Sequence, residues 1–271
     1  MNDQPKVSII TVCFNSAKTI RDTIESVINQ TYQNIEYIII DGGSTDGTVD
    51  IIKEYEPYIA KWVSEPDNGI YDAMNKGILM ASGIIIGLVN SDDFFEKEAI
   101  KIVVETYLKN PSADAFYGQA RVIDENNDMA FIMNPPASFS EKNKYQMNIP
   151  HGSVFITRQC YYEQGVYDIK YKLAADHDLL LRLIGENRKM LHINKLLTNQ
   201  RLGGASSINY KHTFKEYKTI NIINGQSILR AWKQYYFSII KTHIFILITK
   251  NPNIAHLYAK YKNRQHRGLL E

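Results

Sequence analysis

Four apolar runs of strand length alternate with four stretches of helical periodicity over the first 108 residues of this 271-residue chain. Buried strands that alternate with helices favour right-handed crossovers and a parallel sheet covered on both faces, so we expect an α/β fold. Ser44 or Thr45 is expected to cap the second helix, with Asp46 in its first turn. The expected strands are Val7–Phe14, Ile35–Ile40, Ala60–Val63 and the run from Ile84, and the expected helices are Thr19–Asn29, Thr45–Tyr55, Tyr71–Met80 and Glu96–Leu108.

The fourth apolar run, Ile-Ile-Ile-Gly-Leu-Val, ends in Asn90, Ser91, Asp92 and Asp93. Two adjacent carboxylates at the end of a buried strand repel each other and lose hydration, so something must compensate them. Mg²⁺ or Mn²⁺ would do so, because these ions prefer hard oxygen ligands such as carboxylates and phosphates. Alternatively, Asp92 caps the next helix in a solvated loop. The pair by itself leaves both interpretations open.

The carboxyl ends of parallel strands meet along one edge of a sheet, where ligands of such folds bind. Gly42 and Gly43 let the backbone turn sharply and approach a ligand at that edge. The stretch Cys13–Ala17 contains no glycine, so neither a dinucleotide fingerprint nor a Walker loop follows the first strand. An acidic edge would need a metal ion to accept phosphates. The expected edge residues are Asn15, Asp41, Glu65, Asp67, Asn90, Asp92 and Asp93.

Composition indicates an ordinary globular protein, with 44% hydrophobic and 22% charged residues. Two cysteines give no disulfide framework and suit a reducing, cytoplasmic compartment. Val7–Phe14 has no basic region before it and no small-residue cleavage site after it, so we expect a strand and not a signal peptide. The charges that give the net +2 are unevenly distributed along the chain. Residues 209–271 have eleven basic and two acidic side chains, whereas residues 1–208 have 20 basic and 27 acidic ones.

Four ordered motifs resemble those of the family 2 glycosyltransferases: VSIITVCFN, IIDGGSTDGT, SEPDNGIYDAMNKG and NSDD. The resemblance implies the GT-A fold, inversion at the anomeric carbon, and a nucleotide-sugar donor, usually UDP-linked. It implies that Asp41 binds the base with Asp67 close to it, and it places Asn15 in the donor site. Asp92 would reach the ribose or the metal, and Asp93 would ligate Mn²⁺ or Mg²⁺ on the diphosphate. Relatives often have a basic residue where Met74 stands, so either Lys76 substitutes for it or this chain selects a different base.

The second half is expected to contain strands at Ala115–Tyr117, Ala120–Ile123 and Val154–Ile156, a polar loop from 125 to 148, and an apolar helix at Leu179–Ile184. Asp176 and Asp178 lie near the start of that helix, where either could be the N-cap. By resemblance, Asp176 is the catalytic base that faces the acceptor, and Asp178 is structural. Ala175 stands where many relatives have Glu, a difference that leaves the base in place.

Two further residues have both a functional and a plain interpretation. Close relatives have a His-Gly pair where His151 stands, in the donor-sugar or acceptor pocket, whereas an isolated histidine is more often a surface or satisfied buried group. The last family-like motif, residues 200–207, is expected to be a loop that folds over the diphosphate. In it Arg201 could pair with a phosphate and Gly203–Gly204 could be a hinge, or the segment is a surface turn.

We therefore expect a metal-dependent, inverting glycosyltransferase that transfers a hexose or N-acetylhexosamine to a glycan or lipid-linked acceptor in surface polysaccharide biosynthesis. A related nucleotidyltransferase would need a glycine-rich basic loop after the first strand, and Cys13–Lys18 does not provide one. A non-catalytic sugar-nucleotide-binding module is the remaining alternative. We do not expect this protein to bind nucleic acid.

Residues 209–271 are expected to form a helical, basic segment outside the catalytic domain of residues 1–208. Tyr235–Thr249 falls short of the roughly 20 apolar residues that span a bilayer. Aromatic and apolar residues beside Lys and Arg favour peripheral attachment of residues 213–267 to the inner face of the cell membrane. A helix packed on the catalytic domain, or on a second subunit of a homo-oligomer, is the alternative.

Overall fold

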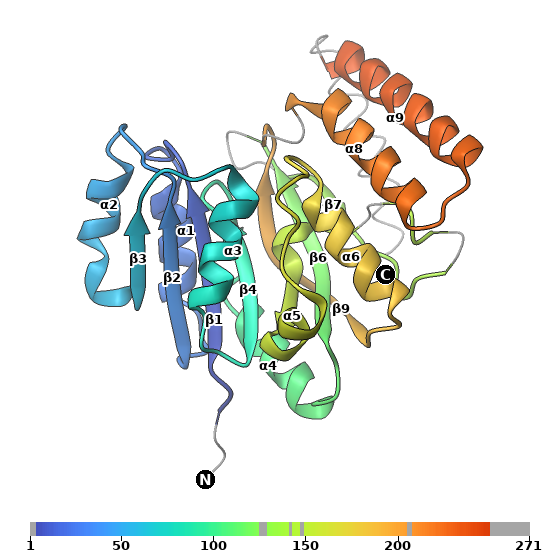
Figure 1. The fold of residues 1–271 in the computed structure, drawn as a ribbon. Helices are drawn as coiled ribbons and strands as arrows, with labels where there is room; N and C mark the ends of the chain where they lie inside the picture. The colour runs from blue at the N-terminus through green and yellow to red at the C-terminus, as the bar shows by residue number, and fades with distance from the viewer. Residues whose placement is uncertain (1–3, 125–128, 141–142, 147–148, 205–207, 250–271) are drawn as a thin grey trace.

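The structure is a computed structural model that describes residues 4–124, 129–140, 143–146, 149–204 and 208–249. Nine strands in this part of the chain form one sheet in the order β3-β2-β1-β4-β8-β6-β9-β5, with β7 paired to β6. Helices cover both faces of the sheet (Figure 1). The expected α/β fold is confirmed.

The first four strands are parallel, as the alternating pattern predicts. All their carboxyl ends therefore lie on one edge of the sheet, and the observed bounds differ from the expected ones by only a few residues. The strands are β1 (Val7–Cys13), β2 (Ile35–Asp41), β3 (Lys61–Ser64) and β4 (Ile85–Asn90), and the helices are α1 (Ile20–Ile28), α2 (Thr48–Glu54), α3 (Ile70–Met80) and α4 (Ala99–Lys109), with the short η1 (Glu56–Tyr58) before β3.

Strand β6 (Ala115–Ile123) is continuous where two strands are expected. Its pairing with the parallel strand β9 shifts register around Gly118 and Gln119. A Cβ on Gly118 would lie 2.6 Å from Leu197 Cδ1, so glycine permits the close approach of the two strands. The irregularity bends one strand and does not end it.

Two strands of the second half, β7 and β9, have no counterpart among the expected elements. Strand β7 lies within the segment expected to be a loop, and the 12-residue β9 mixes polar and apolar residues without a clear period of two. Strand β8 pairs antiparallel with both β4 and β6. The remaining elements are β5 (Phe94–Phe95), β7 (Met129–Met133), η2 (His151–Ser153), β8 (Val154–Thr157), α5 (Arg158–Gln164), α6 (Ala175–Gly185) and β9 (Met190–Arg201).

The expected cap of α2 is wrong. The helix begins at Thr48 after Gly47, whose φ is 97°, and no side chain caps it. Asp46 lies before the helix and accepts hydrogen bonds from Thr48 and from the backbone of Ala17, while Ser44 bonds to Asp41. The side chains that could cap α2 instead stabilise the loops at the sheet edge. The N-caps of α4 and α6 are Glu98 and Ala174, so neither Asp92, Asp176 nor Asp178 is a helix cap.

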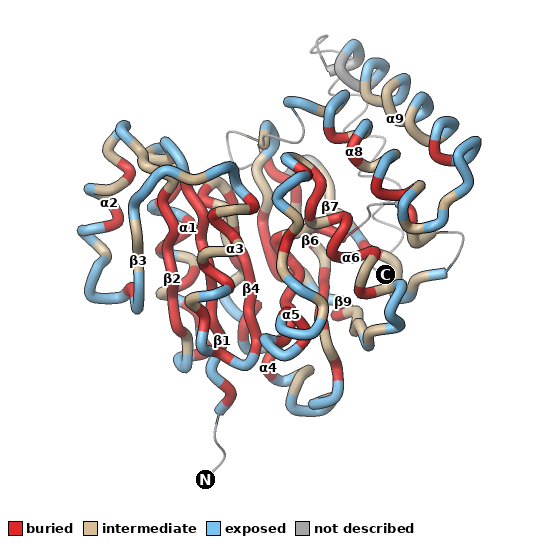
Figure 2. The backbone as a smooth tube through the Cα atoms, viewed as in Figure 1, coloured by how far each residue is buried: buried red, intermediate tan, exposed pale blue. Residues whose placement is uncertain are grey.

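The central strands are buried along most of their length (Figure 2). Their alternate residues belong to two apolar clusters: Ile10 and Ile38 share one cluster with residues of α3 and α6, and Ile9 and Ile39 share the other with residues of α1 and α4. This is the period-two alternation of a strand buried on both faces.

Helices α8 (Tyr210–Ile223) and α9 (Ile228–Thr249) follow the sheet and lie side by side next to α6 (Figure 1). Ile220 of α8 is fully buried in the same cluster as α6, so α8 is part of the packed body. In the described part of the chain, no helix is both long and apolar enough to cross a bilayer. Residues 250–267 of the expected membrane segment lie outside the described residues.

Candidate active site

Asp41 is the last residue of β2 and is fully buried. Its carboxylate accepts hydrogen bonds from the backbone of Gly43 (3.1 Å) and Ser44 (2.9 Å), from Ser64 Oγ (2.6 Å) and from Ser44 Oγ. Burial raises the pKa of Asp41, but the bonds from Ser44 and Ser64 outweigh burial and hold the pKa below its ordinary value. The charged carboxylate thus stabilises the turn after β2 and holds it against β3.

Asn15 joins the ends of β1 and β2. Its backbone N–H donates to Ser44 Oγ (2.7 Å), and its side-chain oxygen accepts from the backbone of Thr45 (3.0 Å). Its φ is 50°, in the left-handed region that Asn tolerates better than most residues. Ser16 continues the connection along the edge, because its hydroxyl lies 2.7 Å from that of Ser91 after β4.

Asp67 lies on the loop between β3 and α3, directly beside Gly42. A Cβ on Gly42 would lie 2.5 Å from Asp67 Oδ2, so only glycine fits there without a shift of that side chain. Asp67 Oδ1 accepts the backbone N–H of Gly69 (2.8 Å) at the start of α3. Lys76 of α3 pairs with Glu65 on the same loop (2.9 Å), whereas Met74 is buried in the core.

Asp92 and Asp93 follow β4 and form the most unfavourable charge pair of the edge. Burial raises the pKa of Asp92, and burial together with the charge of Asp92 raises the pKa of Asp93 well above its ordinary value. The side-chain oxygen of Asn90 is buried and has no hydrogen-bond partner among the described residues. Anionic and neutral hard oxygens that lack compensation are the donor set that Mg²⁺ or Mn²⁺ prefers, so these residues fit such an ion.

The described residues contain no cluster of three or more His, Cys, Asp or Glu side chains that could hold a metal ion. A metal held by one or two carboxylates plus substrate phosphates does not need such a cluster. The Asp92–Asp93 pair therefore suits an ion that arrives with a diphosphate better than one caged by protein alone.

Arg201 is the last residue of β9, and not part of a loop as expected. Its backbone N–H donates to Asp93 Oδ1 (2.9 Å), and its guanidinium contacts the backbone carbonyl of Asp92 (2.9 Å), Asp22 (2.5 Å) and the face of Phe94. Arg201 thus attaches β9 to the acidic pair. Gly204 also lies near the acidic pair, since a Cβ built on it would be 4.0 Å from Asp92 Oδ2. Residues 205–207 of the expected loop lie outside the described residues.

Asp176 is the second residue of α6 and accepts a hydrogen bond from Tyr71 of α3 (2.9 Å). The N-termini of the two helices meet at this bond, since Tyr71 is the second residue of α3 and Asp176 the second residue of α6. Asp178, by contrast, is buried and pairs with Arg182 one turn later (3.0 Å). Arg182 also donates to the backbone carbonyl of Val166 (2.7 Å), so Asp178 belongs to a structural network.

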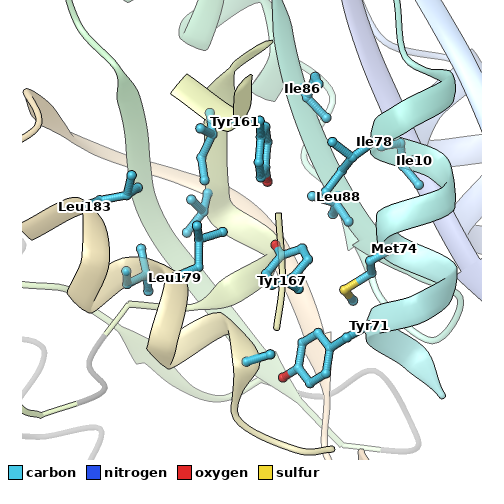
Figure 3. Packing of buried hydrophobic residues seen from close by; sticks show 14 of the residues in the cluster. Ile10, Tyr71, Met74, Ile78, Ile86, Leu88, Tyr161, Tyr167, Leu179 and Leu183 are labelled. Atoms are coloured by element: carbon cyan, nitrogen blue, oxygen red, sulfur yellow. The ribbon is translucent and has the colours of Figure 1, made fainter. Parts of the chain in front are cut away.

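His151 lies in η2, with Nε2 2.8 Å from the hydroxyl of Tyr167. Burial lowers the pKa of His151, although the charge of Asp176 opposes that shift, so a neutral imidazole is favoured at neutral pH. The ring centroids of Tyr167 and Tyr71 are 5.3 Å apart, and Figure 3 shows these two side chains near each other. Through the bonds of Tyr167 to His151 and of Tyr71 to Asp176, the four side chains form one continuous cluster.

The model of the family described as glycosyl transferase family 2 matches residues 8–165. The chain belongs to this family. An uncharacterised glycosyltransferase of Mycobacterium tuberculosis is 35% identical over 186 residues, which are 67% of this chain and 70% of that protein. Chondroitin synthase of Escherichia coli is 30% identical over 86% of this chain, but the match covers only 34% of the synthase.

Solved glycosyltransferase structures share the fold. S. aureus TarS (residues 1–349) in complex with UDP has a TM-score of 0.61 at 17% identity, covering 83% of this chain and 68% of that one. A mannosyltransferase from Pyrobaculum calidifontis, in complex with GDP-Man and Mn²⁺, has a TM-score of 0.64 at 16% identity, covering 96% and 80%. The expected GT-A fold is confirmed.

For this family 2 glycosyltransferase, sequence reasoning identified the acidic edge but missed the aromatic cluster around Asp176. Tyr71 and Tyr167 come from segments 96 residues apart, and nothing in their spacing predicts that they meet. One signal was available: Tyr71 is an amphipathic residue within the SEPDNGIYDAMNKG motif, two positions after Gly69 at a helix start.

Proposed function

We propose that this family 2 glycosyltransferase is an inverting, divalent-metal-dependent enzyme that transfers a hexose or N-acetylhexosamine from a UDP-linked donor to a glycan or lipid-linked acceptor in surface polysaccharide biosynthesis. The observation that supports it best is the contact between the donor-side loop and Asp176. The hydroxyl of Tyr71 donates to Asp176. The backbone carbonyl of Asn68, the residue after Asp67, accepts a hydrogen bond from Lys172 on the segment that leads into α6. The loop proposed to bind the nucleotide and the carboxylate proposed as the base are therefore joined by direct hydrogen bonds.

In this proposal Asp93 and Asp92 hold the metal ion. Their raised pKa values and the unpartnered oxygen of Asn90 are the supporting observations. The bound ion would stabilise the negative charge on the leaving diphosphate. The Mn²⁺ of the mannosyltransferase complex is in line with this assignment and leaves the choice between Mn²⁺ and Mg²⁺ to experiment.

Asp176 is proposed as the base that accepts the proton of the acceptor hydroxyl. Attack from the face opposite the diphosphate would invert the anomeric centre. The remaining donor and pocket assignments are proposals that rest on the family motifs and on the placement of the residues near the sheet edge. They are Asn15, Asp41 and Asp67 for the nucleoside, Lys76 as the substitute for a basic residue at position 74, Arg201 for the diphosphate, and His151 for the donor-sugar or acceptor pocket.

A UDP donor is supported by the TarS complexes with UDP and UDP-GlcNAc. A panel of sugar nucleotides incubated with the protein and Mn²⁺, with release of nucleoside diphosphate as readout, identifies the donor. We expect turnover with at least one UDP-sugar and its loss with EDTA. Pyrophosphate release from a nucleoside triphosphate and a sugar phosphate would instead indicate a nucleotidyltransferase, and binding without turnover would indicate a non-catalytic module.

The base assignment predicts that Asp176→Asn reduces transfer by about 10²–10⁴-fold, the usual contribution of a general base. Asp178→Asn is the matched control for specific chemistry, because it changes the neighbouring carboxylate that pairs with Arg182. Thermal unfolding measured for both variants separates lost chemistry from lost fold. Transfer near the wild-type rate in folded Asp176→Asn would show that another group is the base.

The helical segment from residue 209 is proposed to attach the enzyme to the inner membrane surface. Along α9, exposed apolar residues recur every three or four positions, which places them on one side of the helix. We name this surface the α9 face: Leu229, Trp232, Tyr236, Ile240, Ile244 and Leu247. Basic residues lie on the same helix, and each contributes roughly 1 kcal/mol at an anionic leaflet. A contact with a second subunit is the competing use of the same face.

A further inference from the structure

Tyr71 lies where the N-terminus of α3 meets the N-terminus of α6. Its side chain is nearly buried, and its hydroxyl donates to Asp176 Oδ1 at 2.9 Å. In Figure 3 the Tyr71 ring projects from α3 with Tyr167 beside it. The bond crosses 105 residues of sequence and connects the loop after β3 directly to the proposed base.

Two contacts restrain the Tyr71 ring. The ring packs on Tyr167 at a centroid distance of 5.3 Å. Asn75, one turn after Tyr71 on α3, bonds to both backbone groups of Tyr167, at 2.8 Å to its carbonyl and 3.0 Å from its N–H. The aromatic pair is therefore attached to α3 at both ends.

A second connection holds the segment that precedes α6. Lys172 Nζ donates to the backbone carbonyl of Asn68 (3.1 Å), on the loop beside Asp67. Glu216 of α8 accepts the backbone N–H groups of Lys172 (2.8 Å) and Leu173 (2.9 Å). The start of α6 is thus bonded to the donor-side loop on one side and to α8 on the other.

We propose that Tyr71 is a positioning residue that fixes the orientation of the Asp176 carboxylate and ties it to the Asp67–Gly69 loop. A hydrogen bond from a phenol to a carboxylate is charge-assisted and directional, so it restricts how the carboxylate can rotate. Burial and the charge of Asp176 raise the pKa of Tyr71 well above its ordinary value, so the phenol keeps the proton it donates. The consequence for transfer rests on the proposed role of Asp176 as the base.

Other titratable groups also face Asp176, and the variants used in a test must leave them unchanged. The charge of Asp176 contributes to the pKa of a group on each of five neighbouring segments, while Asp178 is paired with Arg182. These groups are Tyr71 of α3, His151 of η2, Tyr167 of the connecting loop, His177 of α6 and Tyr217 of α8.

The test follows the carboxyl-carbon NMR signal of Asp176 at neutral pH in protein labelled with ¹³C-aspartate, with the signal assigned by its loss in Asp176→Asn. No substrate is needed. We expect Tyr71→Phe to move this signal, because the carboxylate loses a hydrogen bond. Replacement of Tyr71 by 3-fluorotyrosine, a stronger hydrogen-bond donor, should move it in the opposite direction. Tyr32→Phe is the matched control, since it removes a buried hydroxyl that bonds to the Pro5 carbonyl before β1.

With the donor that the nucleotide-sugar panel identifies, Tyr71→Phe should lower kcat roughly 10-fold or more while the donor KM changes less than about three-fold. An Asp176 signal that stays in place in Tyr71→Phe and in the fluorotyrosine protein overturns the inference. A moved signal together with active Asp176→Asn leaves the positioning intact and refutes the base assignment alone.

Discussion

The carboxylates at the sheet edge differ in pKa because they differ in what surrounds them. Asp41 is more buried than Asp92, yet its pKa is lowered, since five donors, including the thiol of Cys13, contact its oxygens. Asp93 has a second carboxylate beside it, and its burial and that charge outweigh the contributions of Arg201 and the Asn90 side chain, so its pKa is raised. The proposed metal site therefore lies at Asp92–Asp93 and not at Asp41, where protein donors already compensate the charge.

Glu36 of β2 lies away from the site, and its carboxylate should contribute to the stability of the fold. It is nearly buried, and Ser8 (2.6 Å), Ser82 (2.7 Å from its backbone) and Lys61 (3.1 Å) all contact its carboxylate. Burial raises its pKa, but these contacts more than offset burial and bring the pKa to about 2. Relative to an unfolded value of 4.5, the ionised group contributes up to about 3 kcal/mol of stability at neutral pH.

Because the folded pKa is depressed, this stability is present above pH 4.5 and is lost as the pH falls toward about 2. We expect Glu36→Gln to lower the free energy of unfolding in urea at pH 7, with the difference from wild type shrinking through that window. Glu54→Gln, which breaks an exposed pair with Arg21, should change stability by less than about 1 kcal/mol. Equal effects of the two substitutions would contradict the assignment.

At the scale of elements, helix α3 links the Asp67 loop to the proposed base Asp176. Its N-terminus contributes Tyr71 and follows the Asp67 loop, while its other end packs on β1 through Gly77. A Cβ on Gly77 would lie 2.4 Å from Ile10 Cγ2, a distance that real side chains do not reach. The small residue sets how closely the helix approaches the sheet, and so where Tyr71 meets Asp176.

Gly77→Ala tests this packing. Alanine is the better helix former by roughly 1 kcal/mol, but the clash with Ile10 should outweigh that gain, for a net loss of about 1–3 kcal/mol. Gly185→Ala in α6 is the matched control, since nothing lies within 4 Å of its added Cβ, and it should be neutral or stabilising. Urea denaturation compares the two. Stabilisation by both substitutions would show that α3 has room to move.

At the scale of the whole molecule, α9 presents its apolar side to solvent. Ala231 is buried against α8, whereas Leu229 is 85% exposed and Leu247 is 69% exposed. Lys218 of α8 lies 3.4 Å above the centroid of the Trp232 ring, which brings a cation to the edge of the α9 face. Apolar, aromatic and basic groups on one helix suit the interface of an anionic bilayer.

The prediction is that the intact protein floats with phosphatidylglycerol vesicles at low salt and is partly released at 1 M salt, where charges are screened within roughly 3 Å. Leu229→Glu combined with Ile240→Glu and Leu247→Glu should leave it in the soluble fraction, because three charges would enter the apolar region. Leu108→Glu on α4 changes an equally exposed residue elsewhere and should float like wild type. Failure of the intact protein to float, with a dimer in light scattering, would assign the α9 face to a second subunit.

The local pattern of the sequence was sufficient for the parallel half of the sheet and its acidic edge. Continuous apolar runs and helical periodicity report the burial of single elements, and parallel strands that follow one another through crossovers end on a common edge, so Asp41, Asp92 and Asp93 could be placed at that edge from the sequence. The family motifs added the GT-A fold, which the structure confirms.

Only the tertiary structure decided which distant segments meet. Strand β9 mixes polar and apolar residues and pairs with both β6 and β5, and Arg201 at its end reaches Asp93 from 108 residues away. The bond from Tyr71 to Asp176 depends on the distance between α3 and α6, which packing around Gly77 and Tyr167 sets. Such contacts have no period in the sequence, because they arise from the shapes of packed surfaces and not from any one element.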